Sequence, residues 1–267
     1  MTLSPLLSDY DHVLLDLDGC VWVGDECTRN AAEAVSELRA AGKTLAFLTN
    51  GARCSPEEYV RKLWSLGLRA SLEEVVTVGA AIQFELAGWG HGASAYVIGS
   101  PAIHRHVAEA GLRIVNHGGD PGVPADVVVI AGHDGFDYGE LRGATQAVLG
   151  GAQMMAAGRD RTFPARDGIC PGTGAIAAAL EYATERVAIN VGKPEPQIFR
   201  TALDRLGPGR TLVVGDRLDS DLAGAAAAGL DAAIVLTGVT SKDEAERARD
   251  PAPVAIAPDL HSLLLSG

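Results

Sequence analysis

His12-Val-Leu-Leu-Asp-Leu-Asp-Gly19 is the stretch that decides the fold, because a short apolar run ends here in two aspartates and a glycine. Such a run is typical of a buried parallel strand that leads into a polar loop. Residues 30–41 then place apolar side chains on one helical face, and residues 44–48 form a second buried strand. This β-α-β order predicts a mostly parallel sheet with helices on both faces.

The same rhythm returns near the other end of the chain, with strands over 211–215 and 232–236 around an alanine-rich helix over 221–228. Between the two halves, residues 95–156 alternate strands and helices of their own. We therefore predict an α/β protein with a doubly wound parallel-sheet core over 1–80 and 187–267. An inserted α/β domain is predicted over 81–186.

Two further local patterns complete this prediction. Ser55-Pro56-Glu57-Glu58 is a capping box that begins a helix, whose apolar stripe includes Val60, Leu63 and Trp64. The glycine-rich stretch from His117 to Gly122 is predicted to be a surface turn.

Composition excludes several classes of protein. Lys and Arg number 22 and Asp and Glu 34, and the formal net charge of −12 opposes binding to nucleic acid or to anionic membranes. No apolar run is long enough for a transmembrane helix, and the beginning of the chain does not resemble a secretory signal. Because the four cysteines lack the spacing of a disulfide frame or a zinc site, we expect free thiols and a cytoplasmic location.

Polar residues follow three of the predicted core strands: Asp16 and Asp18, then Thr49 and Asn50, then Asp216. Ligands of parallel sheets bind beyond the carboxyl ends of the strands, so these residues are expected to meet. Clustered carboxylates repel one another unless a cation lies among them, and Mg²⁺ prefers such oxygen ligands together with a substrate phosphate.

The residue types fit transfer of a phosphoryl group. With metal on one oxygen of Asp16, the other oxygen can attack phosphorus and form an aspartyl-phosphate. Asp18 can protonate the leaving alcohol and then accept a proton from water. Thr49, the backbone amides near Asn50 and Gly51, and Lys193 can neutralise charge on the phosphoryl oxygens.

Four motifs in order resemble those of haloacid dehalogenase (HAD) phosphatases: Asp16-Leu-Asp-Gly19, Leu48-Thr-Asn50, Gly192-Lys-Pro194 and Gly215-Asp-Arg-Leu-Asp-Ser-Asp221. The resemblance implies a HAD-like Rossmannoid core with Asp16 as nucleophile and Asp18 as acid and base. It also implies that Thr49 and Lys193 hold phosphate and that Asp16, Asp18 and Asp216 bind Mg²⁺. Asp221 would orient the waters of the metal.

The insertion between the second and third motifs resembles a type IIA cap, found in the branch that includes nitrophenylphosphatase-like and phosphoglycolate phosphatase-like enzymes. Residues 133–141 and the segment from Phe163 to Gly174 are similar to cap signatures of this branch. The resemblance therefore covers nearly the whole chain. It implies a small phosphorylated metabolite as substrate, such as phosphoglycolate, glycerol phosphate, a sugar phosphate or a nucleotide monophosphate. By analogy, we expect a homodimer formed through the cap.

Some residues keep an ordinary structural alternative. Thr49 and Asn50 can close a turn, Asp219 can be a helix N-cap, and Asp160 can be either a turn residue or a substrate contact from the cap. Gly51 stands where many members of the family carry an Asn or a Ser, so one side-chain donor is missing.

Cys20 and Trp22 follow the first motif at positions where small or aliphatic residues are common. A narrowed substrate entrance and a purely structural role are both open for them, and for Cys20 we favour the structural one.

Two other functions compete with a phosphatase. A phospho-acceptor signalling module would share the metal site, the phosphorylated Asp, the Thr and the Lys, but it lacks the second Asp and the large insertion. A catalytically silent binding protein on the same fold would bind Mg²⁺ with no chemical consequence.

Overall fold

The computed structural model describes residues 2–90, 92–116, 123–165 and 168–266, and it divides the chain into two compact units. The first unit comprises residues 1–49, 56–76 and 193–267, and the second comprises residues 50–55 and 77–192. The divisions lie at 76/77 and 192/193, where 80/81 and 186/187 are the predicted boundaries, and residues 50–55, predicted in the core, belong to the second unit. The predicted turn at His117 to Gly122 lies outside the described residues.

The first unit is built on a six-stranded sheet with the order β16-β15-β14-β2-β5-β6. Its central strands pair in parallel, as predicted. The strands are β2 (His12–Asp16), β5 (Thr44–Thr49), β6 (Val75–Thr77), β14 (Thr211–Gly215), β15 (Asp231–Val235) and β16 (Ala255–Ala257). All five residues of β2 and of β14 are buried, which explains their near-continuous apolar sequences.

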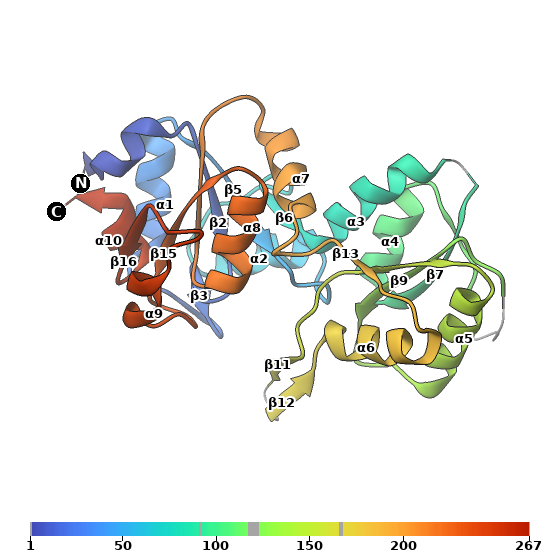
Figure 1. The fold of residues 1–267 in the computed structure, drawn as a ribbon. Coiled ribbons are helices and arrows are strands. Elements are labelled where there is room, and N and C mark those ends of the chain that lie inside the picture. The colour runs from blue at the N-terminus through green and yellow to red at the C-terminus, as the bar shows by residue number, and fades with distance from the viewer. Residues whose placement is uncertain (1, 91, 117–122, 166–167, 267) are drawn as a thin grey trace. The chain divides into compact units, whose positions relative to one another are not determined.

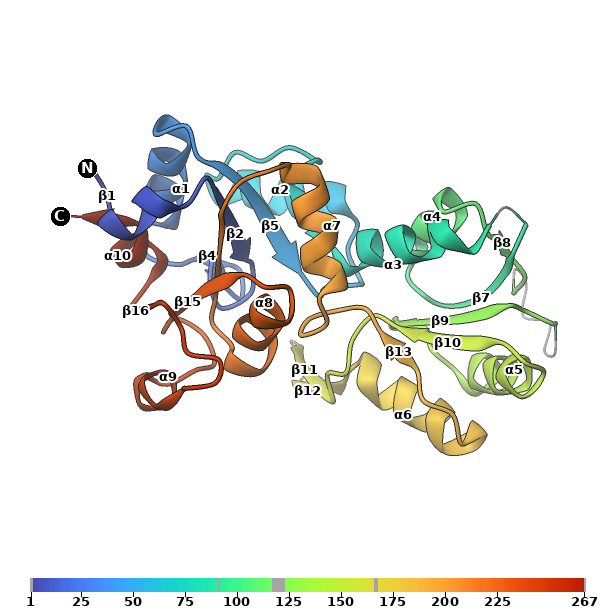
Figure 2. The ribbon, with the colours of Figure 1, turned by 45° about the horizontal axis from the view of Figure 1, so that its top comes forward.

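Helices cover both faces of this sheet (Figure 1 and Figure 2). One face packs its buried side chains, Val13, Leu15 and Phe47 among them, with those of α1 and α10 into one core. On the opposite face lie α7 and α8 (Figure 2). The helices of the unit are α1 (Ala31–Ala40), α2 (Pro56–Ser65), α7 (Gln197–Leu206), α8 (Ala223–Ala227), α9 (Lys242–Arg247) and α10 (Leu260–Leu264).

Among the described residues, three short strand pairs and several one-turn helices accompany the sheets. The hairpin β3 (Trp22–Val23) and β4 (Glu26–Cys27) follows the first motif, and β1 (Thr2–Leu3) pairs with β17 (Leu265–Ser266). β11 (Thr162–Ala165) pairs with β12 (Gly168–Pro171) in the second unit. The one-turn helices η1 (Pro5–Asp9) and η2 (Ala87–Trp89) are 3₁₀, whereas η3 (Leu218–Leu222) is a π-helix.

The second unit has a five-stranded sheet with the order β13-β10-β9-β7-β8, and all four pairings are parallel. The strands are β7 (Ser94–Gly99), β8 (Arg113–Ile114), β9 (Val127–Gly132), β10 (Gln153–Ala156) and β13 (Ile189–Asn190). Its helices are α3 (Val78–Leu86), α4 (Pro101–Glu109), α5 (Tyr138–Leu149) and α6 (Thr173–Thr184). The inserted α/β domain predicted from the alternating pattern is therefore present as a compact unit.

Trp64 departs from the predicted core stripe of α2. Its side chain is 62% exposed, whereas Tyr59 and Leu63 of the same helix are buried. The indole instead donates a hydrogen bond to the carbonyl oxygen of Ala70, 2.8 Å away, beyond the end of the helix. In the described part of the chain, no helix is long and apolar enough to cross a membrane.

Candidate active site

The site of the first unit forms where three neighbouring strands end. Asp16 is the last residue of β2 and pairs with Leu48 of β5, so Thr49 lies one step beyond it on the adjacent strand. On the other side, Val214 pairs with Leu15, which brings Gly215 level with Asp16 and Asp216 just past the edge. All three side chains, Asp16, Thr49 and Asp216, are buried.

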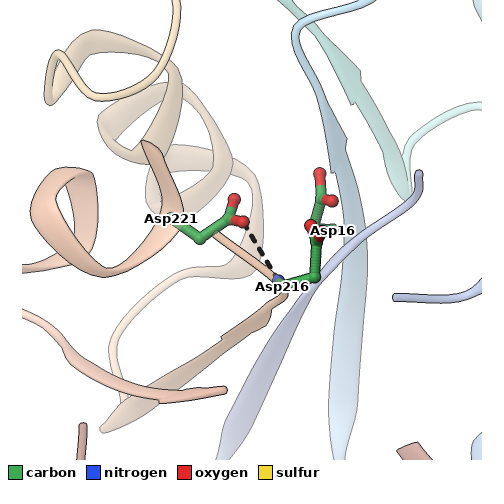
Figure 3. A group of neighbouring side chains, drawn as sticks. All are labelled: Asp16, Asp216 and Asp221. Carbon is green, nitrogen blue, oxygen red and sulfur yellow. Dashed lines mark hydrogen bonds between the residues drawn. The ribbon is translucent and has the colours of Figure 1, made fainter. Parts of the chain in front are cut away.

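Three carboxylates gather at this edge. Asp16, Asp216 and Asp221 each present an oxygen within 4.8 Å of the others, and all three are buried (Figure 3). Asp216 precedes η3 and Asp221 lies within it; η3 is a π-helix, a kind of helix that is often found at functional sites. Asp221 turns back toward the strand end, where its Oδ2 accepts the backbone N–H groups of Asp216 and Arg217 at 3.2 and 3.1 Å.

Lys193 supplies positive charge to this group. Its Nζ donates hydrogen bonds to Asp16 Oδ1 and, at 2.7 Å, to Asp221 Oδ1. Burial alone would lower the pKa of Lys193, but the charges of Asp16 and Asp221 outweigh it and raise that pKa. Lys193 is therefore a permanent cation, as a phosphate-holding role requires.

The carboxylates are short of positive charge. Burial raises the pKa of Asp16 well above its usual value, and the charges of Asp221 and Asp216 add to this while Lys193 opposes it. Burial also raises the pKa of Asp216. Three ionised carboxylates and one ammonium leave a net charge of −2, which one divalent cation would balance.

Asp216 carries the clearest sign of a cation site. Its Oδ2 accepts the backbone N–H of Val239 at 2.6 Å, whereas its Oδ1 is buried and has no hydrogen-bond partner among the described residues. A buried carboxylate oxygen is costly to leave unpaired. A hard cation fits this oxygen, because Mg²⁺ binds through one or two carboxylates and retains waters.

Glycines shape the surroundings of Asp216. A Cβ at Gly19 or at Gly238 would overlap its carboxyl group, and Gly19 also has a positive φ of 87°. The loop after β15 thus approaches closely enough for Val239 to donate its N–H to the carboxylate. Both glycines leave the space that the carboxyl group of Asp216 occupies, although the sequence motifs include only Gly19.

The remaining predicted site residues are placed as follows. Asp18 is exposed, and its Oδ1 accepts a hydrogen bond from the indole N–H of Trp22 at 2.8 Å. Its carboxylate does not belong to the group of three buried carboxylates. Asn50 and Gly51 continue the chain from Thr49 into the second unit. Asp160 is an exposed residue beyond β10 in that unit, where its carbonyl oxygen accepts the N–H of Gly174 at 3.0 Å.

Three ambiguous residues now have a structural account. Asp219 forms an ion pair with Arg217 at 2.9 Å, and the residue that caps η3 is Arg217 rather than Asp219. Cys20 and Trp22 are 0% and 1% exposed, so a role in narrowing an open substrate entrance is wrong for both side chains. Their position is explained by the tight turn after Asp16, which folds them into the core of the unit.

Comparison with known proteins agrees with this geometry. Residues 13–113 match the model of a family described as haloacid dehalogenase-like hydrolase, and residues 190–263 match a second model of HAD-like hydrolases. The D-glycerol 3-phosphate phosphatase of Mycobacterium tuberculosis is 37% identical over 98% of this chain and 73% of its own length. An acid sugar phosphatase of Staphylococcus saprophyticus is 32% identical over 97% of this chain and 98% of its own.

A solved structure extends the likeness to three dimensions. The crystal structure of the M. tuberculosis glycerol phosphate phosphatase in complex with magnesium superposes with a TM-score of 0.91 at 37% identity. The match covers 99% of this chain and 79% of that one. The chain belongs to the haloacid dehalogenase-like hydrolase family, in its branch of phosphatases with an inserted α/β cap. It is a hydrolase that uses Mg²⁺, and the predictions of fold, enzyme class and cofactor are confirmed.

Proposed function

We propose that the chain hydrolyses phosphomonoesters of small polyols or sugars through an aspartyl-phosphate on Asp16. The observation that carries the proposal is the buried set of Asp16, Asp216, Asp221 and Lys193 at one sheet edge. Relatives named for glycerol phosphate, acid sugar and 5'-nucleotide substrates support small phosphorylated metabolites as the substrate class.

Two residues would hold the metal directly. Asp216 offers the buried Oδ1 that lacks a partner, and Asp16 lies within reach of the same ion. Both oxygens of Asp221 are engaged, by Lys193 and by backbone amides, which suits it to orient Lys193 and metal-bound water. Trp22 engages only Oδ1 of Asp18, so a contact between Asp18 and the metal would come from Oδ2 or from its backbone carbonyl oxygen. Bound Mg²⁺ would supply positive charge beside the phosphoryl oxygens.

The reaction then divides between two aspartates. An oxygen of Asp16 forms a bond to phosphorus while the bond from phosphorus to the ester oxygen breaks, and Asp18 gives its proton to that oxygen. In the second half, the oxygen of a water molecule bonds to phosphorus and the bond to Asp16 breaks. Asp18 takes the proton of the water. Lys193, Thr49 and the amides at Asn50 and Gly51 neutralise the phosphoryl charge.

We propose that the second unit acts as the cap and selects the leaving group. Polar side chains follow the carboxyl ends of its strands: Ser100 after β7, His133 after β9 and Asp160 after β10. His133 lies 3.0 Å from Glu140, so its ring is oriented by a carboxylate. The Ser100 hydroxyl is buried and donates to the carbonyl oxygen of Ala52 at 2.8 Å, so His133 and Asp160 would recognise hydroxyl groups of the departing alcohol.

A homodimer through the same unit is also proposed. Tyr182, Val187 and Ile189 are 92, 79 and 50% exposed along the segment that leads from α6 into the edge strand β13. An exposed apolar edge of this kind is often covered by another chain. Light scattering on Ile189→Glu tests whether this edge forms the dimer, with Leu72→Glu in the first unit as the control.

The cytoplasmic location and the exclusion of nucleic acid and membranes as partners stay predictions from the sequence.

Phosphate release from a panel of esters tests the proposed activity. The panel contains glycerol phosphates, phosphoglycolate, sugar phosphates, nucleotide monophosphates and 4-nitrophenyl phosphate, each with Mg²⁺ and with EDTA. We expect turnover that requires Mg²⁺ and that Asp16→Asn abolishes. Native protein that binds Mg²⁺ and releases no phosphate from any ester would refute the proposal.

A further inference from the structure

The indole of Trp22 is tied to the carboxylate of Asp18. Its Nε1 donates to Asp18 Oδ1 at 2.8 Å, and the backbone between them is a tight turn. The N–H of Gly19 donates to the carbonyl oxygen of Trp22 at 2.7 Å, and the N–H of Trp22 donates to that of Leu17 at 3.1 Å. The turn therefore places the indole ring of Trp22 against Asp18, which lies four residues earlier in the chain.

The ring itself is held firmly. Trp22 is 1% exposed, and its ring stacks on Tyr59 with centroids 6.4 Å apart and an interplanar angle of 7°. Lys62 places its Nζ 4.4 Å from the centroid of the same ring and donates to the carbonyl oxygen of Gly24 at 2.8 Å. Both contacts come from α2, so the indole N–H points in one fixed direction.

Asp18 has no comparable support in the chain. It is exposed, and the indole N–H is the one side-chain donor that the structure gives it among the described residues. A carboxyl group at the surface otherwise turns freely about its side-chain bonds. A fixed donor on Oδ1 removes this freedom and leaves Oδ2 as the oxygen that can carry a proton.

We propose that Trp22 is a positioning residue for the acid and base of the reaction, which it serves by holding Asp18 Oδ1 and presenting Oδ2 for proton transfer. This inference rests on the proposed function. The proton moves from Asp18 Oδ2 to the ester oxygen as the bond from that oxygen to phosphorus breaks. In the second half-reaction, a proton of the attacking water returns to Oδ2 as the bond between phosphorus and Asp16 breaks.

Two esters whose leaving groups differ in their need for a proton show whether Asp18 is correctly positioned for proton transfer. A glycerol or sugar alkoxide needs a proton as it departs, whereas 4-nitrophenolate is a stable anion that departs without one. Because kcat/KM reports the steps up to cleavage of the ester, loss of alignment lowers kcat/KM for the alkyl ester much more than for the aryl ester. A general fault in folding or in phosphate binding lowers both values together.

Trp22→Phe removes the N–H and keeps an aromatic ring against Tyr59. We expect the ratio of kcat/KM for glycerol 3-phosphate to that for 4-nitrophenyl phosphate to fall on the order of ten- to a hundredfold. Trp64→Phe is the matched control, since it removes an indole N–H that donates to Ala70 instead, and its ratio should equal the native one. An unchanged ratio in Trp22→Phe would overturn the inference.

Two further variants keep the inference testable. In an Asp18→Asn background, Trp22→Phe should cause no further fall in kcat/KM for glycerol 3-phosphate, because the carboxyl group that Trp22 positions is already absent. If Trp22→Phe does not fold, Tyr59→Leu loosens the stacked ring and should lower the same ratio by a smaller factor. Equal losses on both esters in that variant overturn the inference, whereas a native protein without turnover refutes the proposed function itself.

Discussion

Lys193→Met is expected to destabilise the chain strongly when no metal is present. Lys193 is the cation bound to both Asp16 and Asp221, and the three side chains are 4, 9 and 1% exposed. Removal of one partner from a buried ion pair commonly costs about 3–5 kcal/mol, because it leaves charge buried and unpaired. We expect a loss of this size in the free energy of unfolding at neutral pH in EDTA.

Urea unfolding followed by circular dichroism measures this loss. Lys242→Met is the matched control, since Lys242 and Glu246 form an exposed i, i+4 pair at 3.6 Å with exposed fractions of 70 and 56%. That change should cost no more than about 0.5 kcal/mol. Saturating Mg²⁺ should recover part of the stability of Lys193→Met, because the ion replaces the lost positive charge. If the free energy of unfolding of Lys193→Met in EDTA lies within about 1 kcal/mol of the native value, the view that Lys193 neutralises the carboxylates is refuted.

Two further predictions concern the metal. Gly238→Ala places a Cβ against the carboxyl group of Asp216 and should weaken Mg²⁺ binding about tenfold or more by calorimetry. Gly88→Ala, with open space around its Cβ, is the control; equal affinities would contradict the role of Gly238. Because burial raises the pKa of Asp16 and of Asp216 above 3.8, these two groups hold more protons in the metal-free folded chain than in the unfolded chain. Their contribution to stability therefore falls as pH rises through the raised pKa values, and Mg²⁺ should raise the Tm more at about pH 8 than at about pH 5.5. Equal shifts in Tm at both pH values would contradict this prediction.

The sequence predicted most of the fold because its strands are buried on both faces. Runs such as Val13 to Leu15 and Leu212 to Val214 are apolar throughout and are soon followed by polar residues, a pattern that few other structures produce. Helices α3 and α6 were not predicted, because Val78–Leu86 and Thr173–Thr184 are rich in small and apolar residues and lack a clear polar face.

The sequence indicated which residues form the candidate site, but not which of them contact one another. Motif order identified Asp16, Lys193 and Asp216, whereas the two-sided binding of Lys193 depends on the turn through η3, which returns Asp221 to the strand end. The hydrogen bond from Trp22 to Asp18 has a weak signal in the sequence, a spacing of four residues around a glycine. Such a spacing fixes no side-chain direction until the turn itself is known.

The most direct test of the central claim is to trap the phosphorylated enzyme and locate the phosphate. Brief reaction with a turned-over ester is followed by acid quench, reduction with borohydride and peptide mass spectrometry, in native protein and in Asp18→Asn, which slows the second half-reaction. The account predicts reduction of Asp16 to homoserine, with more product in Asp18→Asn. Modification of another residue, or phosphate release with no acyl-phosphate at Asp16, would contradict it.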